Sequence, residues 1–325
     1  MHSKNSAMVE INLLREPETL PQLLSLGEVF MDKLLRNKKA IILFVAPAFL
    51  LFTFVLFIPI CQSVYFSFCS YDALTKPEFI GLENYKQLLF QDKTMRIALK
   101  NSLFFMIFSC VSQLIMGLLL AAFLMNINKG RNFFKNVYYL PCVLSSAALG
   151  LLWMFIFSPK LGINQILSTW GIEGPLWLMD VSGFINLPMK VIAFVALWQY
   201  VGQSMMLYMA QISGIDKSLY EAAYMDGATK KQAFFRITLP LIRPMVATAM
   251  SLNCIGSLKF FDLIFNMTEA GPNHQTEVLA THLYTQGFKY FKYGYASAIG
   301  VVLLALCLIM TFVINKFVKV DSYEM

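Results

Sequence analysis

The chain has 325 residues, of which 58% are hydrophobic and 14% are charged, and its mean hydropathy is +0.61. A soluble domain is about half apolar and about a quarter charged, so this composition excludes an ordinary soluble protein and indicates a membrane protein. A net charge of +7 is also found in nucleic-acid binders. In so apolar a chain we attribute it to Lys and Arg residues in cytoplasmic loops and expect no nucleic-acid partner.

The first 39 residues differ from the rest of the chain. Four glutamates stand there among basic residues, and the segment lacks the apolar core of a cleavable signal peptide. We therefore predict a cytoplasmic extension over residues 1–39 and a transmembrane domain over residues 40–320.

Six apolar segments follow, each close to the length of about 20 residues that a bilayer-spanning helix needs. They predict an all-α, polytopic membrane protein with six transmembrane helices and no separate soluble domain. The segments run from Ala40 to Cys61, between Lys100 and Lys129, between Lys135 and Lys160, between Lys190 and Asp216, from Pro244 to Met267 with an interruption at Lys259, and between Lys292 and Lys316.

The distribution of Lys and Arg predicts the orientation of these spans. With the N-terminus in the cytoplasm, the inner segments hold 16 of these residues and the outer segments hold 10. The loop between the second and third spans is very short and carries Lys129, Arg131 and Lys135, which favours the inside. Both termini and the loop over residues 213–240 are therefore expected in the cytoplasm.

The loop over residues 213–240 begins with a predicted short helix. Ser218 and Glu221 have the S-x-x-E spacing of a capping box, in which each side chain bonds the other residue's amide. Gly227 suits the left-handed residue that ends a helix. We expect the first helix of the loop to lie between Ser218 and Gly227.

A second capping box predicts a second helix in the same loop. Thr229 and Gln232 have the T-x-x-Q spacing, and the helix is expected to run to about Arg236. Pro240 is expected to break it before the fifth span. The loop is thus a helix-turn-helix held to the bilayer at both ends.

The first helix of the loop carries the features of a docking element. Ala222 and Ala223 allow another backbone to approach closely, and Glu221 and Asp226 place charges near the two ends. Two alternatives remain from these residues alone. One is an amphipathic loop lying on the lipid surface, and the weaker one is a DNA-reading helix-turn-helix of small net charge.

The stretch "YEAAYMDGATKKQAFFRITLPLIRP" resembles the EAA loop of ABC importer permeases, whose pattern is EAA-x-x-x-G-x9-I-x-LP. The resemblance extends over roughly residues 41–319 to the carbohydrate-uptake branch, of the maltose, lactose and glycerol-phosphate type. The supporting stretches are "FIGLENYKQLL", "YLPCVLSSAALGLLWMFIF", "LGINQIL" and "GSLKFFDLIFNMTEAGPNHQTEVLATHLY". The matching loop residues are Glu221, Ala222, Ala223, Gly227, Ile237, Leu239 and Pro240.

This resemblance implies one subunit of an importer in the cytoplasmic membrane of a prokaryote. A second permease subunit, usually a different chain, two ATPase subunits and an extracytoplasmic solute-binding protein that delivers a carbohydrate would complete it. The EAA loop would act as the coupling helix against the ATPase, and ligands would drive alternating access by their differential affinity for its two states. The implied coupling contacts are Glu221, Ala222, Ala223, Asp226 and Gly227.

ATP chemistry is expected elsewhere, because the sequence contains no G-x-x-x-x-G-K-[ST] phosphate loop. We expect this chain to be no enzyme and to hold no cofactor, with ATP and Mg on the partner ATPase. The three histidines are scattered and the six cysteines lack ligand spacing, so no metal site is expected and the cysteines are predicted to be small buried apolar residues.

Polar residues in the fourth and fifth spans are candidates for the solute pathway, because polar groups at membrane depth are costly unless they line a pathway or pair. Gln199 and Gln203 are four residues apart and so share a helix face, as do Asn253 and Ser257. Tyr200 adds an aromatic ring. The resemblance implies that these two spans contact sugar, but gluing of helices fits the amides equally well.

Lys259 and Asp262 are three residues apart in the fifth span and are expected to pair, as a structural element or as part of an outer gate. The stretch "EAGPN" after them predicts a turn on the outer side, where a binding protein could dock.

Two other classes compete with the importer subunit. A self-contained secondary transporter needs an intramembrane acid or ion site and usually an internal repeat, and an intramembrane enzyme needs a clustered nucleophile and base. The sequence offers only Lys259 and Asp262 for the first and no such cluster for the second. It names no sugar, but the lack of a cationic pair among the candidate residues favours a neutral solute.

Overall fold

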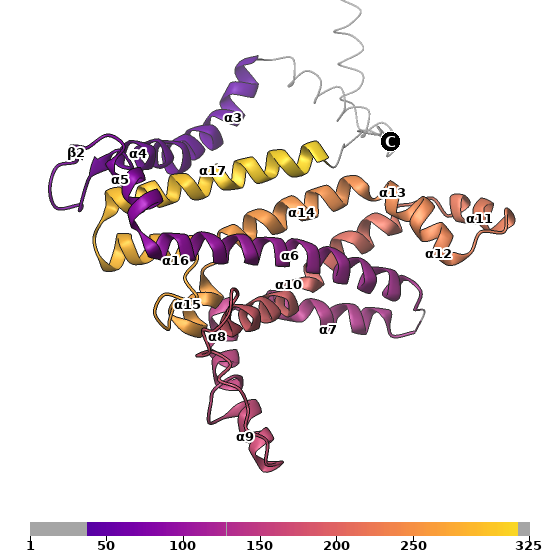
Figure 1. Cartoon of the computed structure of the whole chain (residues 1–325). Coiled ribbons are helices and arrows are strands. Elements are labelled where there is room, and N and C mark those ends of the chain that lie inside the picture. The colour runs from indigo at the N-terminus through magenta and orange to yellow at the C-terminus, as the bar shows by residue number, and fades with distance from the viewer. Residues whose placement is uncertain (1–37, 128, 318–325) are drawn as a thin grey trace, which may run out of the picture. The chain divides into compact units, whose positions relative to one another are not determined.

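The computed structural model describes residues 38–127 and 129–317, so the predicted extension lies almost entirely outside the described residues. The described part is built of helices, with a single short antiparallel pair of strands, β1 (Cys69–Ser70) and β2 (Glu78–Phe79) (Figure 1). The predicted all-α class is confirmed.

The first span is a continuous apolar helix over residues 41–66. It consists of α3 (Lys38–Phe52), a π-helical turn η1 (Thr53–Phe57) and α4 (Ile58–Phe66). None of its side chains from residue 41 to residue 62 is buried. The described residues 38–62 belong to one compact unit, and the described residues from Ser63 onward belong to a second.

The second unit contains three long, straight spans, which are α6 (Lys93–Met125), α10 (Leu187–Ser213) and α17 (Tyr293–Phe317). Two of them begin at capping side chains. The carboxylate of Asp92 accepts from the Met95 amide at 3.1 Å, and the Asn186 side chain accepts from the Met189 amide at 2.9 Å. These caps satisfy amides that have no partner inside the helix, so α6 starts well before the Lys100 bound expected from the sequence.

The predicted third span is broken in the middle. It consists of α7 (Arg131–Val143) and α8 (Ser146–Ile156), which meet at an angle of 95°. Pro141 lies in the last turn of α7 and cannot donate a backbone hydrogen bond. The backbone of α7 also approaches Gly202 on α10 so closely that an added Cβ would clash with the Tyr138 carbonyl oxygen.

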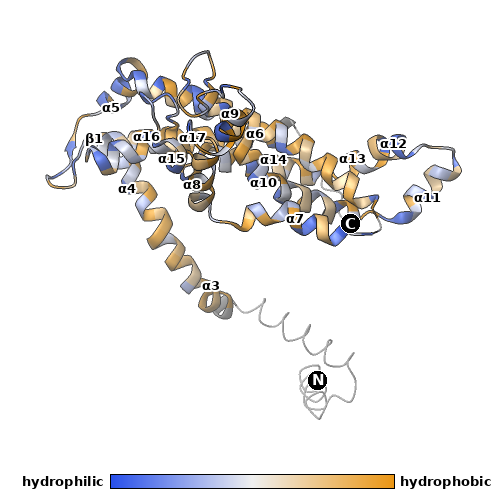
Figure 2. Ribbon diagram, turned by 90° about the horizontal axis from the view of Figure 1, so that it is seen from below, coloured by the Kyte–Doolittle hydropathy of each residue, from blue (hydrophilic) through white to orange (hydrophobic). Residues whose placement is uncertain are grey.

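The predicted fifth span consists of α14 (Arg243–Leu258) and α15 (Asp262–Thr268). A further helical segment, residues 230–241, precedes it at an angle of 67°. Four helices of the described part are long and apolar enough to span a membrane, and the number rises to the predicted six if each of the two bent pairs is one span. Orange, apolar residues are prominent along α6 in Figure 2.

Shorter elements connect the spans. In Figure 1, α9 lies at the end of a segment that extends away from α8. The connecting elements are α5 (Glu83–Lys86), η2 (Gln87–Gln91), α9 (Gly162–Thr169), α11 (Lys217–Met225), α12 (Lys230–Ala233), η3 (Phe234–Thr238), α13 (Leu239–Leu241), α16 (Leu279–Tyr284) and η4 (Thr285–Lys289).

A buried polar cluster joins the start of α6 to α16 and α17. Asp92 Oδ2 accepts from the Tyr295 hydroxyl at 2.7 Å and lies 2.9 Å from His282 Nε2. Burial alone would raise the pKa of Asp92, but hydrogen bonds from Tyr295, the Met95 amide and His282 outweigh it and hold this pKa below its ordinary value. The carboxylate therefore stays ionised and ties three helices together.

Replacing Asp92 tests this cluster. Asparagine caps helices about as well as aspartate, so Asp92→Asn keeps the N-cap but removes the charge that Tyr295 and His282 contact. We expect the apparent Tm in detergent to fall by about 5 °C. Asp92→Ala removes the cap as well and should lower it further. In the wild type, the stabilisation is present above the ordinary carboxyl pKa of about 3.9 and is lost as the pH falls through the lower folded value. Equal Tm values for wild type and Asp92→Asn would contradict this account.

Candidate functional site

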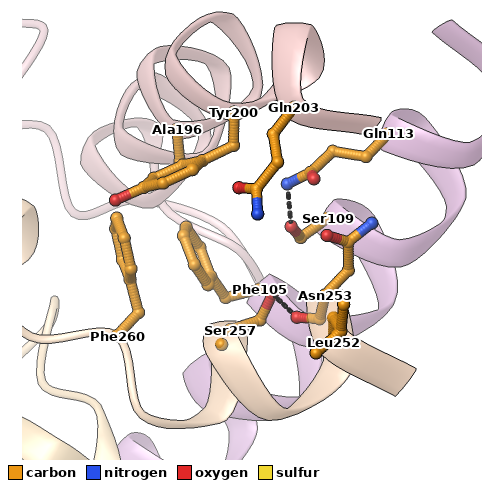
Figure 3. A pocket seen from close by; sticks show the side chains of 11 residues that line it. Phe105, Ser109, Gln113, Ala196, Tyr200, Gln203, Leu252, Asn253, Ser257 and Phe260 are labelled. Atoms are coloured by element: carbon orange, nitrogen blue, oxygen red, sulfur yellow. Dashed lines mark hydrogen bonds between the residues drawn. The ribbon is translucent and has the colours of Figure 1, made fainter. Parts of the chain in front are cut away.

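Three helices enclose a cavity of about 260 Å³, termed here the three-helix cavity. Its walls come from α6, α10, the end of α14 and Phe260 just beyond it, and Figure 3 shows their side chains pointing toward one another. No charged side chain of the described residues lines it. The lining residues are Phe105, Ser109, Gln113, Ala196, Tyr200, Gln203, Leu252, Asn253, Gly256, Ser257 and Phe260.

One side of the three-helix cavity is aromatic. Phe260 stacks on Phe105 with ring centroids 4.9 Å apart, and meets Tyr200 edge to face at 5.9 Å. The Tyr200 hydroxyl lies 3.1 Å from Ser146 Oγ on α8, which fixes the position of its ring. The cavity therefore presents flat, apolar surfaces beside its polar groups.

The other side is a chain of hydrogen bonds between the helices. Gln113 donates to Ser109 Oγ at 2.7 Å and accepts from Ser204 Oγ at 3.3 Å. Asn253 Nδ2 donates to the same Ser204 hydroxyl at 3.3 Å. Because buried amides without partners are costly, this chain fixes how α6, α10 and α14 lie against one another.

The candidate pathway residues divide into two groups. Tyr200, Gln203, Asn253 and Ser257 all line the three-helix cavity. Gln199 is fully buried outside its lining and donates to Ser146 Oγ at 3.0 Å, so it joins α10 to α8. Positions four apart on a helix differ by about 40° in direction, and that offset separates Gln199 from Gln203.

Two lining residues were missed from the sequence. Ser109 and Gln113 are four residues apart on α6, in the second span. The spacing rule that selected residues in the fourth and fifth spans would have found them. The choice of spans, which followed the resemblance, left them out.

The expected pair of Lys259 and Asp262 is wrong for the described chain. No salt bridge of the described residues joins them, and both are exposed. Lys259 lies at the C-terminal end of α14 and Asp262 opens α15, so each complements the dipole of a different helix end. The predicted turn after them is confirmed by left-handed residues at Glu269 and Ala270.

The first helix of the loop, α11, has its N-cap two residues before the predicted Ser218. Asp216 is its N-cap and accepts from the Ser218 amide at 2.9 Å, so the predicted capping box of Ser218 with Glu221 is wrong. Hydrogen bonds from Ser218 hold the pKa of Asp216 below its ordinary value. Its charge also favours the positive end of the helix, which explains why the carboxylate displaces the serine as cap.

The turn after α11 is confirmed in detail. Gly227 has φ of +79°, in the left-handed region. Its amide donates to the Tyr224 carbonyl at 3.1 Å, and the next amide, that of Ala228, donates to the Ala223 carbonyl at 2.9 Å. This pair of bonds is a Schellman motif, which satisfies carbonyls at the helix end.

The second capping box is also confirmed. Thr229 Oγ1 accepts from the Gln232 amide at 3.3 Å, and Gln232 Oε1 accepts from the Thr229 amide at 2.8 Å. The helix does not end near Arg236, however. It continues through the π-helical turn η3 and α13 to Leu241, so Pro240 lies inside it and the break comes two residues after Pro240, at Ile242. The π turn shifts the bonding pattern just before a residue that has no amide to donate.

The outward face of α11 is small and apolar. Ala222 is exposed, with Leu219 and Met225 on either side at exposed fractions of 46% and 88%. Glu221 and Asp226 are exposed as well, and neither is in a salt bridge of the described residues. On the opposite face, the Tyr220 hydroxyl lies 2.8 Å from Thr238 Oγ1, which fastens α11 to η3. The sequence did not identify Leu219 and Met225 as part of this exposed face, because apolar residues in a loop are ordinarily expected to pack against the rest of the protein.

The chain matches the family described as binding-protein-dependent transport system inner membrane component over residues 95–319. The chain belongs to this family. It is a non-catalytic permease subunit of a binding-protein-dependent ABC importer, which confirms the resemblance of the EAA loop. The self-contained secondary transporter and the intramembrane enzyme are thereby excluded.

Individual relatives agree with this assignment. The probable ABC transporter permease protein YurN of Bacillus subtilis is 37% identical over 295 residues, covering 89% of this permease and 99% of that protein. The lactose transport system permease protein LacF of Rhizobium radiobacter is 31% identical over 277 residues, covering 83% and 91%. A solved bacterial ABC transporter involved in the import of the acidic polysaccharide alginate matches with a TM-score of 0.76 at 25% identity, covering 90% of this chain and 99% of that chain.

Gly227 allows a test of the loop's construction. An added Cβ at Gly227 meets nothing within 4 Å, so the cost of Gly227→Ala is the left-handed backbone alone, about 1–2 kcal/mol. We expect hydrogen exchange at the Ala228 amide to quicken about tenfold in Gly227→Ala. Gly227→Asn should change it less, because asparagine tolerates this conformation. Equal exchange in wild type and both variants would contradict the assigned turn.

Proposed function

We propose that this permease imports a neutral sugar or oligosaccharide through the three-helix cavity. The observation that carries the proposal is the lining itself, which combines amides and hydroxyls with aromatic rings and includes no charged side chain of the described residues. Such a set can bind the hydroxyl groups of a carbohydrate while its aromatic rings cover the apolar side of the sugar. On this proposal Tyr200, Gln203, Asn253 and Ser257 contact solute, with Ser109 and Gln113 added from α6, whereas Gln199 holds helices together.

The charge of the solute distinguishes this permease from some of its relatives. The solved bacterial transporter is involved in the import of the acidic polysaccharide alginate, and LacF belongs to a lactose transport system. A carboxylate placed in a cavity without a cationic partner loses its hydration without compensation. The lining therefore supports an uncharged solute, as lactose is.

A second permease subunit is proposed to complete the pathway. Gln203, Leu252 and Gly256 line the cavity and are exposed in the single chain. Lys259 and Asp262 are exposed just beyond them. Because polar and charged side chains at membrane depth face a pathway or protein and not lipid, this side is proposed to face a partner permease across the pore.

The loop is proposed to transmit force from two ATPase subunits, which would hold the ATP and Mg. Ala222, with Leu219 and Met225 beside it, offers a small apolar surface on a helix that is fixed at both ends. Glu221, Ala223, Asp226 and Gly227 are the other proposed coupling residues, and the structure gives Ala223 and Gly227 an additional part in the turn itself.

The remaining assignments follow from orientation. With the N- and C-termini and the loop in the cytoplasm of a prokaryote, the segment containing α9 and the turn at Glu269 would face outward, where a solute-loaded binding protein would dock. The division into an extension over residues 1–39 and a transmembrane domain over residues 40–320 stays part of this proposal.

Solute-dependent ATP hydrolysis by the assembled, reconstituted importer tests the proposed solute class. Binding protein loaded with neutral disaccharides should stimulate hydrolysis, whereas uronate oligosaccharides and glycerol phosphate should not. Gln203→Leu removes one amide from the cavity and should weaken uptake about tenfold, as expected for a lost hydrogen bond.

Gln211→Leu is the matched control, because it makes the same change on the same helix outside the cavity lining. Uptake equal in Gln203→Leu and Gln211→Leu, or stimulation by charged solutes alone, would reject the proposal.

A further inference from the structure

A second cavity of about 270 Å³ lies where α6 and α10 end, and is termed here the terminal cavity. Gln113 in the three-helix cavity and Met125 in the terminal cavity are twelve positions apart on α6, a distance of about 18 Å along the helix. The two cavities are therefore distinct. Lining residues of the terminal cavity include Met125, Ile212, Lys217, Tyr224, Lys230 and Phe234.

The terminal cavity has an apolar floor and a cationic rim. Met125 and Ile212 come from the ends of the two spans, and Phe234 adds an aromatic ring from η3. Lys217 on α11 and Lys230 on α12 supply the charge. Figure 2 shows blue, hydrophilic residues gathering on α11 and α12 beside the orange spans.

The two lysines are without an acidic partner inside the described chain. Neither is in a salt bridge of the described residues, and no carboxylate lines the terminal cavity. The neighbouring Asp216 caps α11 through the Ser218 amide. A third cation, Arg131, contacts the sulfur of Met125 at the edge of the cavity.

The helix ends do not neutralise this charge. The C-terminal ends of α6 and α10 each contribute about −0.5 of an elementary charge, against two full positive charges from Lys217 and Lys230. A net charge of about +1 remains over an apolar floor. The volume is slightly below the range of about 300–1,000 Å³ for small-molecule sites, so the terminal cavity suits a single head group and not a nucleotide.

We propose that the terminal cavity binds one phosphate group between Lys217 and Lys230, with the apolar substituent of the same ligand lying over the ends of α6 and α10. The cavity lies at the ends of two membrane spans, at the depth of lipid head groups, so an anionic phospholipid is one source of the phosphate. A soluble phosphate ester is the other. Occupancy joins α11 and α12 to the spans and stiffens the loop between them, so this inference does not depend on the identity of the transported solute.

The test uses the full chain, purified in mild detergent with the subunits that remain bound. Native mass spectrometry counts retained phosphatidylglycerol against phosphatidylcholine, and hydrogen exchange over residues 217–238 is followed with each lipid and with glycerol 1-phosphate in solution. We expect Lys217→Gln and Lys230→Gln to weaken binding of the phosphate ligand about tenfold each, the loss of one charge-assisted hydrogen bond. The source that slows exchange in the wild type identifies the ligand.

The matched controls are the single variants Lys129→Gln and Lys231→Gln, each of which removes one charge from an exposed position outside the cavity lining. Lys217→Arg with Lys230→Arg separates lost binding from lost folding, because arginine also binds phosphate, and should retain binding. Equal loss of binding in the controls would overturn the proposal in favour of general surface charge. Absence of protection by any of the three ligands in the wild type would overturn it as well.

Discussion

The hydrogen-bonded chain from Gln113 through Ser204 to Asn253 is the interaction on which the rest of the structure depends. Apolar side chains give little orientation to helices in a bilayer, because lipid is as apolar as they are. Hydrogen-bonded polar groups do fix the orientation of the helices, since each group loses its partner if one helix slides or turns. The same bonds that fix α6, α10 and α14 also set out the polar lining of the three-helix cavity, so architecture and proposed solute site arise from one set of side chains.

The loop between α10 and α14 obeys a different constraint, because it must hold its form outside the spans. Asp216 and Thr229 cap its two helices, and the Schellman bonds at Gly227 close the turn between them. The Tyr220 and Thr238 hydroxyls then fasten the first helix to the second segment. These caps and bonds hold the loop in one form, and the small apolar face around Ala222 lies exposed beside Glu221 and Asp226. A rigid element of this kind suits the transmission of movement to the spans.

Much of this could be predicted from the sequence, because long apolar segments and capping patterns are local signals. The six segments, the helix-turn-helix and the special conformation of Gly227 belong to that class. Other features depend on neighbours that are distant in sequence. Gln199 donates a hydrogen bond to Ser146 on another helix. Lys259 and Asp262 lie at the ends of two different helices and do not pair. The close approach of α7 to Gly202 accompanies a break in the third span that composition does not reveal. A local pattern can also mislead: Ser218 fits the spacing of a capping box, but Asp216, two residues earlier, caps the helix instead.

The most direct test of the account is whether a separate ATPase binds this permease through the exposed face of α11. The full chain would be tagged, extracted in mild detergent and analysed for co-purified subunits as wild type, as Ala222→Arg and as Lys231→Gln. Ala222 is exposed and arginine is a good helix former, so the variant blocks docking without disturbing the loop. The account predicts that a Walker-A ATPase and a second permease accompany the wild type and Lys231→Gln, and that Ala222→Arg loses the ATPase while keeping the permease. An ATPase bound equally to all three, or absent from the wild type in several mild detergents, would contradict it.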